Sequence, residues 1–330
     1  MSDYSDLIKK IHEKTISESV RRTYLSQIIE TYPNIPVSII LDDLLIKNKD
    51  AFAIEEQVVS YKNYLKKQAT GQIKTGYKTI DETIRGINPG EVLSFLARTA
   101  VGKTIFGLNV ARNVNLSQKI PIVFFSLEQQ IPQVFERLAA IHLQKSTEEV
   151  EKIFKSNFDA KASSKLIKDL DHIYVVDKNS LTFSQMTEYM AQIEKKIHKH
   201  VSLVIIDYLG YMQSKGQNIY EKTSNLAKEL KAFAKNNDTA VVAIAQVNRS
   251  GLSGGEEITL SSFRDSGVLE ESADYVIGAW RPELELNISE TEEHMRAGQF
   301  KMKVLKNRSG KTGIEVSCDF DTTTLEIVEV

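Results

Sequence analysis

The sequence predicts an α/β fold with a mostly parallel central sheet, antiparallel strands at one edge and a small helical segment at the N-terminus. From residue 75 onward, short continuous apolar runs are separated by helical segments, which is typical of parallel strands covered by helices on both faces. The last runs alternate apolar and polar residues and lie close together, which indicates an antiparallel extension. The expected strands are 91–97, 120–127, 172–177, 201–209, 239–247, 273–281, 300–307 and 313–320.

The 330 residues are enough for one large domain with a smaller appendage. Residues 1–50 predict short helices at 5–14, 17–32 and 37–47, with too little apolar surface for a robust independent domain. Residues 51–74 predict a helix followed by a connector around Gly71. The α/β domain is expected to occupy residues 75–330.

The composition excludes several classes of protein. The chain has 42 Lys and Arg residues against 44 Asp and Glu residues, so a nucleic-acid site must be a local basic patch. No stretch approaches the ~20 apolar residues of a membrane span, and the N-terminus lacks the apolar run of a signal peptide. The single Cys318 excludes an internal disulfide. These features predict a cytoplasmic protein without a membrane partner.

A phosphate-binding loop is predicted at residues 97–104, with the sequence "ARTAVGKT", between an apolar strand and a helical segment. Backbone N–H groups of the loop and the helix start would surround the phosphates of ATP. Lys103 would reach the β- and γ-phosphates, and the Thr104 hydroxyl would bind Mg²⁺. The predicted nucleotide-binding residues are Ala97, Arg98, Thr99, Ala100, Val101, Gly102, Lys103 and Thr104.

The first position of this loop is Ala97, where such loops usually have glycine. Glycine allows backbone torsions and close approaches that the Cβ of alanine restricts. Either the loop turns differently at this position, or the position tolerates a methyl group.

Three further polar side chains end predicted strands. Asp207 ends an apolar strand and is the candidate Mg²⁺ ligand, because ligands of open α/β sheets bind at the carboxyl ends of strands. An acid at the tip of a strand adjacent to the loop can activate water, and Glu128 is the candidate. Spacing alone leaves open whether Glu128 is instead a surface glutamate. Gln246 could sense the γ-phosphate, although polar residues follow most strands.

Taken together, these segments resemble the RecA-like ATPase domain of the DnaB-type replicative helicases of superfamily 4, from about residue 75 to residue 330. The resemblance is carried by six short segments in one order. They are "TGYKTIDETIRGINPGEVLSFLARTAVGKT", "FFSLE", "VIIDYLGYMQ", "AIAQVNRS", "FRDSGVLEESADYVIGAWR" and "KVLKNRSGKTG". The family commonly has alanine at the first loop position, so Ala97 matches it.

The resemblance implies roles that spacing does not provide. It implies that Glu128 is the general base, that Gln246 senses the γ-phosphate, and that Lys306 and Arg308 reach into the nucleotide site of the neighbouring subunit. A cation inserted from a partner accelerates phosphoryl transfer by roughly 10³ to 10⁵. Without the family, the segment "KNRSGK" is more readily interpreted as a solvated turn between two edge strands.

The resemblance also implies contacts with single-stranded DNA. The matching loop contains Arg264, Asp265, Ser266 and Gly267, where an arginine and a glycine backbone can approach phosphates without reading sequence. The family usually has glutamate where this chain has Asp265. Lys215 and Lys222 are further candidates, or ordinary exposed lysines.

The implied protein is a homo-oligomeric ring, expected to be a hexamer, that hydrolyses ATP to translocate on DNA and unwind duplex during replication. The helix at 52–67 takes the place of the family's linker helix, which docks on the next subunit, or packs on its own domain. The family's full helical N-terminal domain, which makes the collar and binds primase, is absent or reduced to residues 1–50. A helicase loader or a primase is a further candidate partner. The alternatives are a DnaB-like ATPase without unwinding activity and a filament-forming recombinase of RecA or RadA type.

Overall fold

The computed structural model describes residues 11, 18–32, 54, 57–58, 61–62, 72–155, 160–247, 255–259, 272–285 and 298–330. The chain divides into two compact units, residues 1–66 and 67–330. In the first unit, helix α2 (Glu18–Thr31) coincides with the helix expected at 17–32. The helices expected at 5–14 and 37–47, apart from Ile11, lie outside the described residues.

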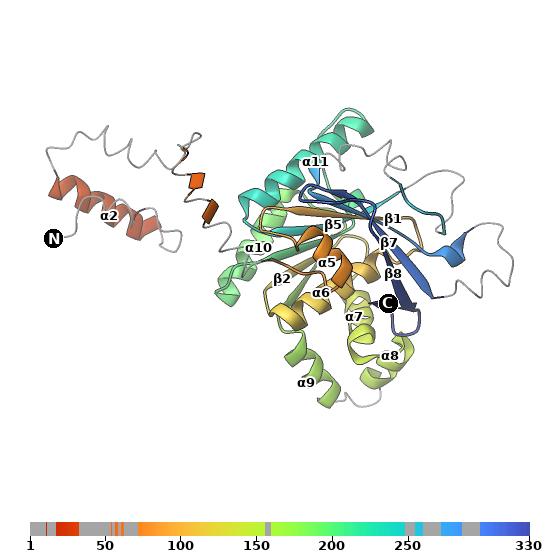
Figure 1. Ribbon diagram of the computed structural model, residues 1–330. Helices are drawn as coiled ribbons and strands as arrows, with labels where there is room; N and C mark the ends of the chain where they lie inside the picture. The colour runs from red at the N-terminus through yellow and green to blue at the C-terminus, as the bar shows by residue number, and fades with distance from the viewer. Residues whose placement is uncertain are drawn as a thin grey trace. The chain divides into compact units, whose positions relative to one another are not determined.

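The second unit is built on a single nine-stranded sheet (Figure 1). Its strands are β1 (Val92–Ala97), β2 (Ile122–Ser126), β3 (Ile173–Asp177), β4 (Leu203–Asp207), β5 (Ala240–Gln246), β6 (Tyr275–Trp280), β7 (Gln299–Asn307), β8 (Glu315–Asp321) and β9 (Glu326–Glu329). Their order is β3-β2-β4-β5-β1-β6-β7-β8-β9. The strands from β3 to β6 in this order are parallel, and β7, β8 and β9 are antiparallel. The expected fold class is therefore confirmed, and β9 is the one strand of the described residues that the sequence did not predict.

Helices cover both faces of the sheet. They are α5 (Lys78–Ile84), α6 (Lys103–Gln118), α7 (Ile131–Leu143), α8 (Thr147–Lys155), α9 (Ala160–Asp169), α10 (Phe183–Ile197) and α11 (Ile219–Asn236), with short 3-10 turns η1 (Leu209–Tyr211) and η3 (Pro282–Leu284). Helices α6 and α7 lie on one side of the sheet, and α10 and α11 on the other (Figure 1). This double cover explains why the parallel strands are continuous apolar runs.

Alternate residues of each parallel strand belong to different cores. In β1, Leu93 and Phe95 pack in the core on the α6 side, whereas Val92 and Leu96 pack in the core on the α10 and α11 side. Phe95 stacks on Phe106 of α6 with 3.6 Å between ring centroids. Fully burying a side chain of this size contributes about 1.5–3 kcal/mol. This packing fixes α6 directly behind the loop from which it starts.

The C-terminal strands are tied to α6 by a buried amide. Asn109 is 0% exposed, and its Nδ2 donates to the carbonyl oxygen of Leu325 at 3.0 Å. Its Oδ1 accepts from the backbone N–H of Ile327 at 3.2 Å. Because a polar group this deeply buried must be hydrogen-bonded, Asn109 fixes β9 against the middle of α6.

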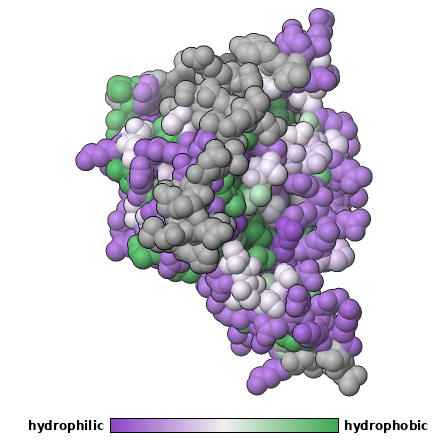
Figure 2. Space-filling view, turned by 90° about the vertical axis from the view of Figure 1, so that its right-hand side faces the viewer, coloured by the Kyte–Doolittle hydropathy of each residue, from purple (hydrophilic) through white to green (hydrophobic). Residues whose placement is uncertain are grey.

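The described surface on the face shown in Figure 2 is mostly hydrophilic, with smaller hydrophobic areas. Among the residues that the structure describes, no helix has the length and apolar character needed to cross a membrane.

We predict that Asn109→Ala lowers the free energy of unfolding by about 2–3 kcal/mol, because it leaves the buried N–H of Ile327 and the part-buried carbonyl of Leu325 without their partner. Urea unfolding followed by circular dichroism measures the change. Asn236→Ala, at the exposed end of α11, is the matched control. Equal stability of the two variants would show that the amide does not hold β9.

Candidate functional site

The loop at residues 97–104 does not turn at Ala97. Ala97 is the last residue of β1 and pairs in register with Gln246 of β5 and Ala279 of β6. Its backbone is therefore extended, and no glycine is needed there. The left-handed conformations fall on Ala100, with φ 66°, and Gly102, with φ 114°. Of the two alternatives for Ala97, the structure shows the second, because an extended residue at the end of β1 tolerates a methyl group.

Helix α6 begins at Lys103, directly after the left-handed Gly102. No side chain of the described residues caps this helix start, so its first N–H groups remain available to an anion. The Nζ of Lys103 donates to the carbonyl oxygen of Arg98 at 3.3 Å and lies 5.8 Å from the ring centroid of Tyr208. Burial lowers the pKa of Lys103, and the charges of Glu128 and Asp207 oppose this shift. These contacts hold the ammonium group beside the loop.

Asp207 is the buried carboxylate of the site. It ends β4, is 0% exposed, and its Oδ2 accepts a hydrogen bond from the Thr104 hydroxyl at 2.6 Å. Its Oδ1 is buried and accepts no hydrogen bond from the described residues. Burial raises the pKa of Asp207 to about 6; the Thr104 hydrogen bond opposes the shift, and the negative charge of Glu128 adds to it. A hydroxyl and a carboxylate with an oxygen to spare form a donor set that suits Mg²⁺.

Glu128 and Gln246 lie at the same sheet edge as the loop. Glu128 is exposed and follows β2, whose last residue Ser126 pairs with Asp207. Its charge affects the pKa values of both Lys103 and Asp207, so the three groups lie near one another. Strands β4 and β5 lie between β2 and β1 in the sheet, and Glu128 is near Lys103 of the loop although β2 does not pair with β1. Gln246 is half-buried at the end of β5, between Asp207 and the loop.

Lys306 lies near the end of β7 and Arg308 directly follows this strand, on the side of the sheet where the parallel strands begin. Lys306 pairs with Val276 near the start of β6, and the Arg308 N–H donates to the carbonyl oxygen of Asp274 at 3.1 Å. The Asp274 N–H in turn donates to the carbonyl oxygen of Val92, the first residue of β1. The phosphate loop, in contrast, begins at Ala97, the last residue of β1. For Arg308, five residues of strand at about 3.3 Å each separate these levels by about 17 Å. Lys306 is nearer, because its partner Val276 is level with Ser94, about 10 Å along the strand from Ala97. The backbone of Arg308 is thus far from the loop of its own chain.

The proposed DNA contacts are only partly within the described residues. Arg264, Asp265, Ser266 and Gly267 lie outside them. Lys215 and Lys222 are exposed in the segment between β4 and the body of α11. The exposure of these two lysines does not test whether they bind DNA.

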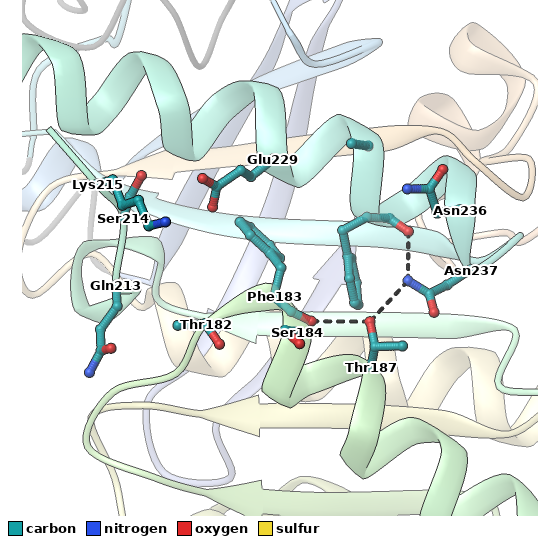
Figure 3. A pocket seen from close by; sticks show the side chains of 12 residues that line it. Thr182, Phe183, Ser184, Thr187, Gln213, Ser214, Lys215, Glu229, Asn236 and Asn237 are labelled. Atoms are coloured by element: carbon teal, nitrogen blue, oxygen red, sulfur yellow. Dashed lines mark hydrogen bonds between the residues drawn. The ribbon is translucent and has the colours of Figure 1, made fainter.

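A surface pocket of about 810 Å³ lies between α10 and α11, and Lys215 is part of its lining (Figure 3). The side chain of Phe183 points toward this space from α10, and Glu229 reaches it from α11 (Figure 3). Its described lining includes none of residues 97–104. The pocket is therefore separate from the phosphate-loop site.

Sequence reasoning missed two residues near these groups. Tyr208 contacts Lys103 through its ring, and Asp274 accepts a hydrogen bond from the Arg308 side chain at 3.0 Å. Both stand beside motif residues in the sequence, since Tyr208 follows Asp207 and Asp274 directly precedes β6. Their contacts are with residues distant in sequence, so no local spacing indicated them.

The fold and the site define a phosphate-loop protein of the RecA-like class. Residues 72–329 match the family described as "DnaB-like helicase C terminal domain", and the chain belongs to this family. The family consists of nucleotide-binding ATPases, as the loop and Asp207 indicate for this chain.

Curated relatives carry related names. The chain is 28% identical over 246 residues to "Replicative DNA helicase DnaB" of Leifsonia xyli subsp. xyli (strain CTCB07), covering 73% of this chain and 52% of that protein. It is 26% identical over 291 residues to "Probable replicative DNA helicase" of Trieres chinensis, covering 84% of this chain and 63% of that protein. The chain thus spans about half to two thirds of the length of these relatives.

Solved structures support the fold. A solved ATPase domain superposes with a TM-score of 0.70 at 24% identity, covering 85% of this chain and all of that one. "The Structure Of A DnaB-Like Replicative Helicase And Its Interactions With Primase" superposes with a TM-score of 0.67 at 22% identity, covering 98% of this chain and 76% of that one. At these identities the likeness shows the fold alone.

We predict that Asp207→Asn stabilises the protein in the absence of nucleotide and metal. The folded-state pKa of about 6 lies above the ordinary 3.8, so the folded state binds the proton more tightly and the ionised carboxylate destabilises it at pH 7. The expected gain is about 1–3 kcal/mol at pH 7, and it shrinks as the pH falls from 6 toward 4.

Urea unfolding at several pH values measures this difference. Asp319→Asn, on an exposed position of β8, is the control. A gain that does not depend on pH would contradict the raised pKa.

Proposed function

We propose that this chain is the motor subunit of an ATP-dependent DNA helicase of DnaB type, in which ATP is hydrolysed between subunits. The observation that carries the proposal is the separation of the phosphate loop from Arg308 across the sheet. Arg308 lies level with the start of β1, and the loop lies at its end. An arginine in this position, called the arginine finger below, can contact the nucleotide site of a neighbouring subunit but not the nucleotide site of its own chain.

In the proposed reaction, the N–H groups at the start of α6 and the ammonium of Lys103 bind the phosphates of ATP. Thr104 and Asp207 would hold Mg²⁺, which neutralises phosphate charge when bound. Glu128 accepts the proton of the attacking water, and Gln246 contacts the γ-phosphate. Lys306 and Arg308 of the adjacent subunit stabilise the charge that develops on the transferred phosphoryl group.

The proposed assembly is a closed ring, a hexamer in our interpretation. The exposed side chains of Ile54, Val58 and Tyr61 support an intersubunit role for the helix at 52–67, since they are 70%, 46% and 60% exposed. Their spacing of four and three residues places them on one face of a helix. We propose that this face docks on the next subunit, with residues 1–50 as a separate helical segment, 51–74 as the connector and 75–330 as the motor domain.

Single-stranded DNA is the proposed substrate of the ring channel, contacted by residues 264–267 and by Lys215 and Lys222. A loader or a primase is a further proposed partner. The relatives named replicative helicase support replication as the process.

We predict that the protein with ATP and Mg²⁺ separates a forked DNA duplex, and that Lys103→Ala abolishes both strand separation and hydrolysis. Lys119→Ala, at the exposed opposite end of α6, should retain both activities. Fluorescence of a labelled fork and release of phosphate are the measurements.

Hydrolysis stimulated by single strands without strand separation would support the ATPase alternative instead. Open helical assemblies in electron micrographs would support the recombinase alternative. Near-normal turnover of Lys103→Ala would refute the assigned nucleotide site.

We further predict that Arg308→Ala binds nucleotide normally but loses hydrolysis by a factor of about 10³ or more. Glu128→Ala should be inactive for a different reason, because it lacks the base. Mixing the two variants restores ATPase activity at interfaces where Glu128 and Arg308 are both intact. Absence of rescue in demonstrably mixed rings would contradict the action of Arg308 on the neighbouring site.

A further inference from the structure

A buried carboxylate connects Arg308 to the sheet. Asp274 immediately precedes β6, and its side chain is 8% exposed. Its Oδ1 accepts from the Arg308 guanidinium at 3.0 Å, and its Oδ2 accepts from the backbone N–H of Val92 at 2.8 Å. One carboxylate therefore links the finger candidate to the first residue of the strand that leads to the phosphate loop.

The same carboxylate has a second cation. The Nζ of Lys231 from α11 lies 2.5 Å from Oδ2 of Asp274 and also donates to the carbonyl oxygen of Gly90 at 2.8 Å. Each oxygen thus has its own partners, with Arg308 on Oδ1 and with Lys231 and Val92 on Oδ2. A buried carboxylate that loses its only cation is strongly destabilised. Because Lys231 stays in place, Asp274 can release Arg308 and remain paired.

The backbone around Arg308 is held separately. The Asn307 Nδ2 donates to the carbonyl oxygens of Thr83 and Lys311 at 3.0 and 3.1 Å, and the Ser309 N–H donates to the Asn307 Oδ1 at 2.9 Å. The side chain of Arg308, by contrast, is 50% exposed. The backbone of the turn is therefore anchored by contacts other than the pair of Arg308 with Asp274.

We propose that Asp274, backed by Lys231, is a positioning residue for Arg308. It holds the guanidinium at the subunit surface, aimed toward the neighbour, and releases it to the charge that develops on the neighbour's nucleotide. Asp274 accepts from the guanidinium through a single oxygen, whereas phosphate oxygens can bind a guanidinium at two points. This inference rests on the proposed action of Arg308 between subunits.

The test is Asp274→Asn in the full chain, measured by steady-state ATPase activity with single-stranded DNA. A misplaced finger lowers kcat by about 10- to 100-fold and leaves KM and nucleotide binding nearly unchanged. In the Arg308→Ala background the same substitution should lower the residual rate by less than about twofold, because Asp274 acts through Arg308. Asp319→Asn is the matched control and should retain the rate of the unmodified protein.

Mixing separates positioning from a general loss of structure. An interface that combines Glu128 of an Asp274→Asn subunit with Arg308 of a Glu128→Ala subunit is intact, so mixed rings should exceed the weighted sum of the two variants. A misfolded variant would give no such rescue.

Lys231→Met provides a second variant if Asp274→Asn does not fold. It leaves the Asp274–Arg308 pair and the Val92 hydrogen bond in place but removes the second cation from the carboxylate, so release becomes harder and kcat should fall several-fold, again only when Arg308 is present. An unchanged kcat in the variants that fold, or equal losses with and without Arg308, overturns the positioning role. Failure of the Arg308→Ala and Glu128→Ala mixture to recover activity would instead overturn the proposed function itself.

Discussion

The common direction of the parallel strands is the constraint on which the rest of the structure depends. Because β4, β5 and β1 are neighbours and run the same way, Asp207, Gln246 and Ala97 end at one edge of the sheet. The alternation of side chains then selects which of them face α6. Thr104 reaches Asp207 across this edge, so one hydrogen bond joins the helix that follows the phosphate loop to a strand 103 residues later in the chain.

This arrangement concentrates strain and charge where chemistry is proposed. Ala100 adopts a conformation that favours glycine, and Asp207 keeps a carboxylate in a fully buried position. Both features lower stability in the absence of a ligand. The packing of Phe95 against Phe106, and of β9 against Asn109, stabilises the surroundings enough for these features to persist.

Much of the architecture was predictable because it depends on local patterns. Continuous apolar runs indicated buried parallel strands, and "VGKT" before a helical pattern indicated the phosphate loop. Strand β9 was missed because it follows β8 after a short turn and, with four residues, is too brief to show a pattern. The order of strands was not predictable, because β2 is separated from β1 by two strands that come later in the chain. The contacts of Asp274 with Lys231 and Arg308 were missed for the same reason, since three distant segments meet there.

The reversal of chain direction between β6 and β7 has a consequence for assembly. A parallel β7 would have ended beside the phosphate loop, and a single chain could then have carried a complete site. Because β7 is antiparallel, Arg308 instead follows it at the end of the strands opposite to the phosphate loop. If Arg308 acts on the neighbouring subunit, an open row of subunits has one complete nucleotide site fewer than it has chains. Only a closed ring has as many complete nucleotide sites as chains. Such head-to-tail contacts are heterologous, and a closed ring then has a direction built into it before any DNA is bound.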